Sequence, residues 1–142
     1  MRLSYVQRVG LILVVILAGC GKNPLGREPI HGSVVLHGDP LDQGAIEFRP
    51  VEKKGGVSSG AVITDGAYSI PSDKGLPPGE YRVMIFSAAA DPSPAPLGPP
   101  GSNPMGGPRP TIERIPPQYN VSSRVIVEVT AGGDNRFDYH IE

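Results

Sequence analysis

The stretch AVITDGAYSI, residues 61–70, decides the fold of this chain. In it, Asp65-Gly66 separates two short apolar segments, 61–64 and 67–70. Asp and Gly tolerate the positive φ angles that a two-residue turn between antiparallel strands requires, so this dipeptide is among the strongest short signals for a hairpin. We therefore predict a β-hairpin at the centre of the chain.

Segments of alternating polarity flank this hairpin on both sides, with the period of two that is typical of half-buried strands. Gly38-Asp39-Pro40 separates the first two segments, and Pro77-Pro78-Gly79 introduces a third. Gly132-Gly133-Asp134 turns the chain between the last two, which we expect to form a closing hairpin. The segments are 30–36, 46–49, 81–85, 125–130 and 136–141.

The chain contains 19 Gly and 17 Pro. After the amino-terminal signal segment, no stretch that is free of Gly and Pro keeps the hydrophobic period of 3.6 residues that is typical of a helix. We therefore predict essentially no helix after the amino-terminal signal segment. Short antiparallel strands with one apolar face must cover that face with another sheet. The sequence predicts an all-β domain, an antiparallel β-sandwich of six to seven strands.

The alternating pattern vanishes over residues 88–117, where 14 of 30 residues are Pro or Gly. Such a segment cannot form a regular ladder of strand hydrogen bonds. We interpret it as an exposed, largely disordered loop that interrupts the domain. A spacer is the interpretation we favour, since each doubling of loop length costs only about 0.6 kcal/mol, and a recognition segment is the alternative.

Residues 1–19 have the parts of an export signal: basic Arg2 and Arg8, an apolar run over 9–18, and small residues before the cut. A membrane span needs about 20 residues of helix, so this run is too short to be one. We predict a signal peptide. The alternative of an ordinary signal peptide with a chance cysteine stays open.

Leu17-Ala18-Gly19-Cys20 resembles the lipobox of bacterial lipoproteins. The resemblance implies that the Cys20 sulfur takes a diacylglycerol, that the peptide is cut before Cys20, and that the new amino group is acylated, with palmitate as a typical chain. Each buried methylene contributes about 0.8 kcal/mol, so two or three chains anchor a protein stably. The resemblance implies that the protein is anchored in the cell envelope. Gly21 stands where an inner-membrane retention signal would place Asp, so the resemblance implies the outer membrane rather than the inner membrane.

Residues 20–29 are polar with Gly and Pro, which is typical of a flexible tether, and the domain follows over 30–142. The chain has 13 basic and 14 acidic residues, and removal of Arg2 and Arg8 leaves 11 against 14, or −3. This balance argues against nucleic acid as a partner. Cys20 is the only cysteine, so no disulfide can form within the chain.

Five stretches of the domain carry a family resemblance: HGSVVLHGDPL at 31–41, GAIEF at 44–48, TDGAY at 64–68, LPPGEYRV at 76–83 and IPPQY at 115–119. They resemble small bacterial lipoproteins with a carboxypeptidase-regulatory-like, or transthyretin-like (prealbumin-like), β-sandwich. The resemblance covers about residues 30–142 apart from the Pro-rich segment. Its motifs are turn signals, so it implies an Ig-like sandwich and no particular chemistry.

No candidate metal or cofactor site emerges from the histidines. His31 and His37 lie six residues apart on one predicted strand, about 20 Å at 3.3 Å per residue, and so cannot share an ion. Only His140 could approach one of them, and a third ligand is not evident. We expect no metal and no cofactor.

Catalytic motifs are absent as well. The chain ends in DYHIE, residues 138–142, whereas hydroxyisourate hydrolase, a transthyretin-like enzyme, ends in Tyr-Arg-Gly-Ser. Ser58, Ser59, Ser122 and Ser123 have no nucleophile elbow around them. Turn chemistry explains Asp65 and Asp134 better than calcium does, since no loop gathers several carboxylates. The lysines Lys22, Lys53, Lys54 and Lys74 fall outside the predicted strands, which argues against an isopeptide crosslink.

The leading hypothesis is a lipid-anchored envelope protein whose sandwich is a non-catalytic binding or structural module. Its expected partners are membrane lipid, through Cys20, and an envelope polysaccharide or envelope protein. The alternative is a transthyretin-like hydrolase or ligand-processing domain that uses His140 with Arg136 or Arg124 near one edge of the sandwich.

Overall fold

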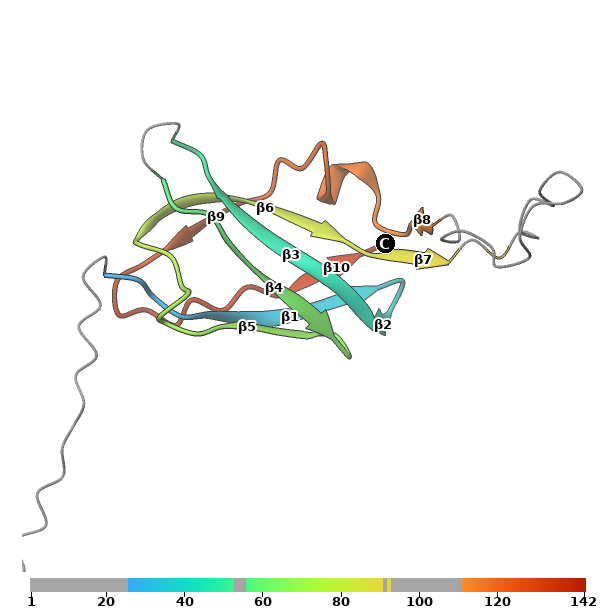
Figure 1. The fold of residues 1–142 in the computed structure, drawn as a ribbon, viewed down its shortest axis with the longest axis horizontal. Helices are drawn as coiled ribbons and strands as arrows, with labels where there is room; N and C mark the ends of the chain where they lie inside the picture. Colours follow the sequence, from blue (N-terminus) through green and yellow to red (C-terminus); the bar gives the residue numbers. More distant parts are fainter. Residues whose placement is uncertain (1–25, 53–55, 91, 93–110) are drawn as a thin grey trace, which may run out of the picture.

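A computed structural model describes residues 26–52, 56–90, 92 and 111–142. These residues form ten β-strands and one turn of 3-10 helix, and they contain no α-helix (Figure 1). The elements are β1 Ile30–Leu36, β2 Asp39–Pro40, β3 Gln43–Pro50, β4 Ser59–Thr64, β5 Ala67–Ile70, β6 Gly79–Phe86, β7 Ala88–Ala90, β8 Thr111–Glu113, η1 Pro117–Tyr119, β9 Ile126–Val129 and β10 Tyr139–Ile141.

The all-β fold is confirmed, and the described residues form one curled sheet of eight strands beside a small two-stranded sheet of β7 and β8. The strands of the curled sheet follow the order β10-β1-β5-β4-β3-β6-β9, with β2 paired to β1. All pairs are antiparallel except β1 with β10. Figure 1 shows β3 and β4 running diagonally between a layer with β1 and β5 and a layer with β6 and β9, so the sheet forms a half-barrel. The predicted sandwich is not confirmed, because hydrogen bonds join both layers into a single sheet.

The core lies inside this curl, and most of its side chains come from the apolar positions of the predicted alternating segments. Phe48 is fully buried at its centre, with its ring centroid 6.2 Å from that of Tyr68 and 6.3 Å from that of Phe137. Burying such a side chain stabilises the fold by about 1.5–3 kcal/mol. The other core residues are Ile30, Val34, Leu41, Ile46, Ile63, Tyr68, Ile70, Leu76, Tyr81, Val83, Ile85, Ile115, Val129, Tyr139 and Ile141.

The turn at Asp65-Gly66 is confirmed as a two-residue hairpin between β4 and β5. The φ angles of Asp65 and Gly66 are 49° and 77°, and Thr64 pairs with Ala67. A second turn of this kind lies at His37-Gly38, with φ angles of 53° and 90°. It starts one residue before the predicted turn signal, so Asp39 begins β2.

The predicted closing hairpin is wrong. β9 pairs with β6, whereas β10 pairs in parallel with β1 at the other end of the strand order. The intervening chain is held by Asn135, which is 3% exposed. Its side-chain oxygen accepts a hydrogen bond from the Thr130 N–H at 2.8 Å, and its amide nitrogen donates to the Thr130 carbonyl at 3.1 Å. The chain therefore crosses to the other edge instead of turning back.

The predicted loop 88–117 has regular structure at both ends, so the part that could be an irregular loop is shorter than we predicted. β7 and β8 pair with each other, with Ala89 opposite Ile112. Ile115, at 2% exposed, packs into the core. Asp91 and residues 93–110, on which the prediction of disorder mainly rests, lie outside the described residues.

The amino-terminal predictions fall almost entirely outside the described residues: the signal peptide 1–19, Cys20, and the first part of the tether 20–29. The end of the tether is bound to the domain, because Glu28 and Leu76 exchange backbone hydrogen bonds of 2.8 and 3.2 Å. Within the part of the chain that the structure describes, no helix is both long and apolar enough to cross a membrane.

Candidate functional site

The outer face of the curled sheet carries a cluster of arginines. Alternation along β3 and β6 directs Phe48 and Val83 into the core and leaves their neighbours outside. In the β3–β6 register, Arg49 lies directly opposite Arg82. Residues opposite each other on one face have Cβ atoms about 5 Å apart. The two guanidinium groups therefore project from the same small area.

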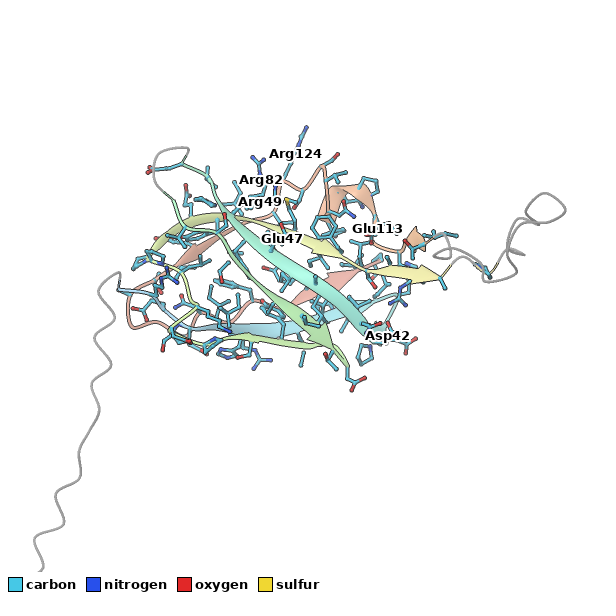
Figure 2. All side chains as sticks on the ribbon, in the orientation of Figure 1. Asp42, Glu47, Arg49, Arg82, Glu113 and Arg124 are labelled. Atoms are coloured by element: carbon cyan, nitrogen blue, oxygen red, sulfur yellow. The ribbon has the colours of Figure 1, made fainter. Side chains whose placement is uncertain are left out.

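Arg124 joins this area from the segment before β9. The Val83 N–H donates to the Val125 carbonyl at 2.9 Å, which continues the β6–β9 pairing and places Arg124 close to Arg82 on the outer face. Figure 2 shows the side chains of Arg49, Arg82 and Arg124 gathered above β3 and β6, with Glu47 beside them.

Two of the three cations have no acidic partner among the described residues. Arg49 donates from Nε and Nη2 to Glu47 Oε2, at 3.1 and 2.8 Å. Arg82 and Arg124 form no hydrogen bond or ion pair with another described residue. Like charges directly opposite each other on a sheet are destabilising, so the pair Arg49–Arg82 is unfavourable for the fold. Glu80 and Glu128 lie on the same outer face, next to the Arg82–Ile126 pair, but form no ion pair with Arg82 or Arg124.

A hollow of about 510 Å³ is lined by two of these arginines, Arg49 and Arg82. Its lining combines cations with apolar side chains, of which Met84 is 8% exposed and Val121 is 75% exposed. We call this hollow, together with the adjacent Arg124, the arginine groove. The residues that line it are Arg49, Pro50, Val51, Arg82, Met84, Phe86 and Val121.

A second polar cluster, around Arg114, is fully engaged within the protein. Ser87, 2% exposed, donates from Oγ to the Gln43 carbonyl at 2.5 Å and accepts from Arg114 Nη2 at 2.7 Å. Arg114 also pairs with Asp42 and, through this hydrogen bond, holds the pKa of the Asp42 carboxyl below its usual value. Glu113 Oε1 accepts from the Ser87 N–H at 2.7 Å. These bonds fasten β8 to the ends of β3 and β6, which is a structural role.

The three histidines do not share one site, although the His37 N–H donates to the Ile141 carbonyl at 2.8 Å, which places the backbone of His37 beside that of His140. His31 Nε2 lies 3.4 Å from Asp134 Oδ1, and both side chains are largely exposed. His37 occupies the turn after β1, and His140 lies on β10 opposite Val35. Among the described residues, no group of three or more His, Cys, Asp or Glu side chains could hold a metal ion.

The residues of the hydrolase alternative also lie apart. Arg136 donates from Nε to Asp138 Oδ2 at 2.9 Å. Asp138 accepts hydrogen bonds from the Ser33 N–H and hydroxyl, both at 2.8 Å, and the Ser33 hydroxyl bond chiefly lowers the Asp138 pKa. Arg124 belongs to the other end of the strand order from His140, and the structure shows no interaction between them. Only Arg124, of these candidates, belongs to the arginine groove.

The remaining predicted loop residues have structural contacts. Ser59 Oγ donates to the Lys74 carbonyl at 2.6 Å, and Asp65 sits in the hairpin turn. Ser123 is buried, and its hydroxyl donates to the Val83 carbonyl at 2.5 Å. Lys53 and Lys54 lie outside the described residues.

Sequence reasoning missed Arg49 and Arg82 as site residues. The alternation of strands 46–49 and 81–85 placed both on the outer face, which was the available signal. Their pairing across β3 and β6 was not readable, because β4 and β5 separate these strands in the sequence. No protein-family model, curated protein or solved structure matches this chain.

Proposed function

We propose that this chain is a lipid-anchored cell-envelope protein whose β-domain is a non-catalytic binding module. The observation that carries the binding role is the arginine groove: Arg82 and Arg124 are exposed and unpaired with described residues, and Arg82 faces a like charge on Arg49. A bound anion would relieve this repulsion and supply the missing partners.

The anchor rests on the sequence. Cys20 follows a signal-like segment, and Arg27, which donates to the Asp73 carbonyl at 3.2 Å, is the first described residue bonded to the domain, so a short linker would tie the β-domain to membrane lipid. The outer membrane is the proposed location. We also propose that the two layers of the half-barrel represent a prealbumin-like arrangement, supported by the shared core between β1, β5, β3 and β6.

An anionic envelope polysaccharide fits the groove better than an envelope protein. A stable protein interface buries about 800 Å² on each side and depends on aromatic and arginine anchors. The groove offers two lining arginines with a narrow apolar floor, and Phe86 is its only aromatic residue. This combination suits a narrow, charged chain.

The anchor is tested by Cys20→Ser, with Gly21→Ala as the matched control at the next residue. We expect the native chain and the control to partition into the detergent phase of a membrane extract, and the Cys20→Ser chain to lose the lipid and leave that phase. Unchanged partitioning of Cys20→Ser would overturn the anchor.

The binding role is tested by isolating the tagged full chain from detergent-solubilised envelopes of the producing bacterium. We expect anionic polysaccharide to co-purify with the native chain and with Arg136→Gln, whose arginine is already paired to Asp138. We expect Arg82→Gln to lose it. The binding role is contradicted if no polysaccharide is retained, or if all three chains retain equal amounts.

A further inference from the structure

We propose that the arginine groove binds a phosphomonoester carried on a sugar, so that the ligand of the proposed binding module is a phosphorylated glycan. This inference rests on the proposed function and names its ligand class. Three features of the groove support it: the two unpaired cations, the arrangement of the arginines, and the apolar floor.

Two cations of the groove are available to an anion. Arg49 is paired with Glu47, whereas Arg82 and Arg124 form no ion pair with another described residue, although Glu80 and Glu128 lie on the same outer face. A phosphomonoester carries about −1.5 to −2 at neutral pH, which two guanidinium groups would compensate, whereas a carboxylate carries only −1. A single carboxylate would therefore leave one of these two cations without a partner.

The arrangement of the cations suits an acceptor with several oxygens. Arg49 and Arg82 approach from two adjacent strands, and Arg124 approaches from the far side of β6. Each guanidinium presents a planar fork of N–H donors that matches phosphate oxygens in pairs. Three phosphate oxygens can accept from different arginines at once, which a carboxylate with two oxygens cannot do equally well.

The floor of the groove suits a sugar attached to the phosphate. Met84, Phe86 and Val121 supply apolar surface beside the cations, on which the C–H face of a sugar ring can pack. The hollow is an open groove, and Arg49 and Arg82 line it directly. A lipid acyl chain would leave hydrocarbon exposed to water there, so a sugar is the better occupant.

The test measures binding of glucose 6-phosphate to the full lipidated chain in non-ionic detergent by isothermal titration calorimetry. Parallel titrations use inorganic phosphate, glucuronate and a soluble short-chain phosphatidic acid. We expect glucose 6-phosphate to bind most tightly. We expect Arg82→Gln to weaken it about tenfold or more, as loss of a charge-assisted hydrogen bond does, and Arg136→Gln to leave it unchanged.

Each other outcome overturns part or all of the inference. If inorganic phosphate binds with equal affinity, the sugar does not contribute to recognition. If glucuronate binds as tightly or more tightly, the groove does not require a phosphate. If phosphatidic acid binds more tightly, the groove recognises a lipid headgroup. No binding of glucose 6-phosphate, or binding that Arg82→Gln leaves intact, overturns the inference as a whole.

The failure of this inference is distinguishable from failure of the proposed function. If glucose 6-phosphate does not bind but Arg82→Gln still abolishes co-purification of envelope polysaccharide, the binding module stands and its ligand is a different anion. If neither effect of Arg82→Gln is seen, the arginine groove is not the binding site. Circular dichroism of Arg82→Gln establishes that the strand content is retained in both experiments.

Discussion

At the scale of single residues, close backbone approach explains positions that the sequence pattern left unexplained. Gly32 lies on β1 where the chain before β10 passes over it, and a Cβ atom there would stand 1.9 Å from the Phe137 carbonyl oxygen. The same carbonyl accepts a hydrogen bond of 2.7 Å from the Tyr68 hydroxyl. Gly32 was predicted only as a strand residue, because its neighbour Phe137 is more than 100 positions away.

Gly32→Ala should destabilise the fold by about 1–3 kcal/mol, since β1 and the Phe137 backbone must separate to accommodate the new methyl group. Gly38→Ala is the control: its φ is 90°, but nothing lies within 4 Å of its added Cβ. We expect a smaller loss there, from backbone strain alone. Urea unfolding followed by tyrosine fluorescence, available because the chain has no Trp, compares the two. A loss at Gly38 that equals or exceeds that at Gly32 contradicts the contact.

Two buried tyrosines make the fold sensitive to alkaline pH. Burial raises the pKa of Tyr68 and of Tyr139 well above the usual value of 10, and the nearby Asp138 charge adds to both shifts. The folded state therefore holds these protons more tightly than the unfolded state. This stabilisation is fully present below pH 10 and is lost as the pH rises above it.

We expect the ultraviolet absorbance of ionised phenol to rise in two steps during an alkaline titration. The later step should coincide with loss of the far-ultraviolet dichroism of the sheet, and Tyr139→Phe should reduce its amplitude. Ionisation of all the phenols near pH 10 while the sheet stays intact would show that Tyr68 and Tyr139 are accessible to solvent.

At the scale of elements, local turns were predictable and long connections were not. Asp65-Gly66 specifies its hairpin through positive φ at two adjacent residues, and that preference is local. The sequence at 132–134 offers a comparable turn signal, yet β9 and β10 separate. Asn135 accounts for the difference, because its buried amide bonds to the backbone and the hydroxyl of Thr130 and fixes the start of a crossing connection.

Asn135→Ala should cost about 0.5–1.5 kcal/mol of stability, because the Thr130 N–H loses its acceptor, whereas the Thr130 carbonyl keeps the Gly133 N–H as a donor. Asp134→Ala, at an exposed neighbouring position, is the control and should change stability by less than about 0.5 kcal/mol. Hydrogen exchange of the β10 amides should speed up in Asn135→Ala only. Equal stabilities of the two variants would mean that Asn135 does not hold the connection.

At the scale of the whole molecule, composition and periodicity predicted the all-β class and most of the core. They could not predict that β3 pairs directly with β6, because the β4–β5 hairpin lies between these two strands in the sequence. This pairing creates the arginine groove. Arg124 was singled out for an enzymatic role with His140, but its neighbours in space are Arg82 and Met84. The candidate site is thus a product of the sheet's strand order.

Ligand binding at the arginine groove should weaken with ionic strength. Exposed charges are screened over about 10 Å at 0.1 M salt and about 3 Å at 1 M. We expect glucose 6-phosphate to bind about tenfold more weakly at 1 M than at 0.1 M sodium chloride. The dependence should be smaller in Arg82→Gln, which has one charge fewer, and an affinity indifferent to salt would rule out electrostatic recognition.

The most direct test of the central claim is the ratio of two dissociation constants, those of Arg82→Gln and the native chain, for polysaccharide isolated from the bacterium's own envelope. Both chains are measured in full length and in the same detergent. We predict a ratio of about ten or more, with Arg136→Gln close to one. A ratio of one for Arg82→Gln would contradict the arginine groove as the binding site.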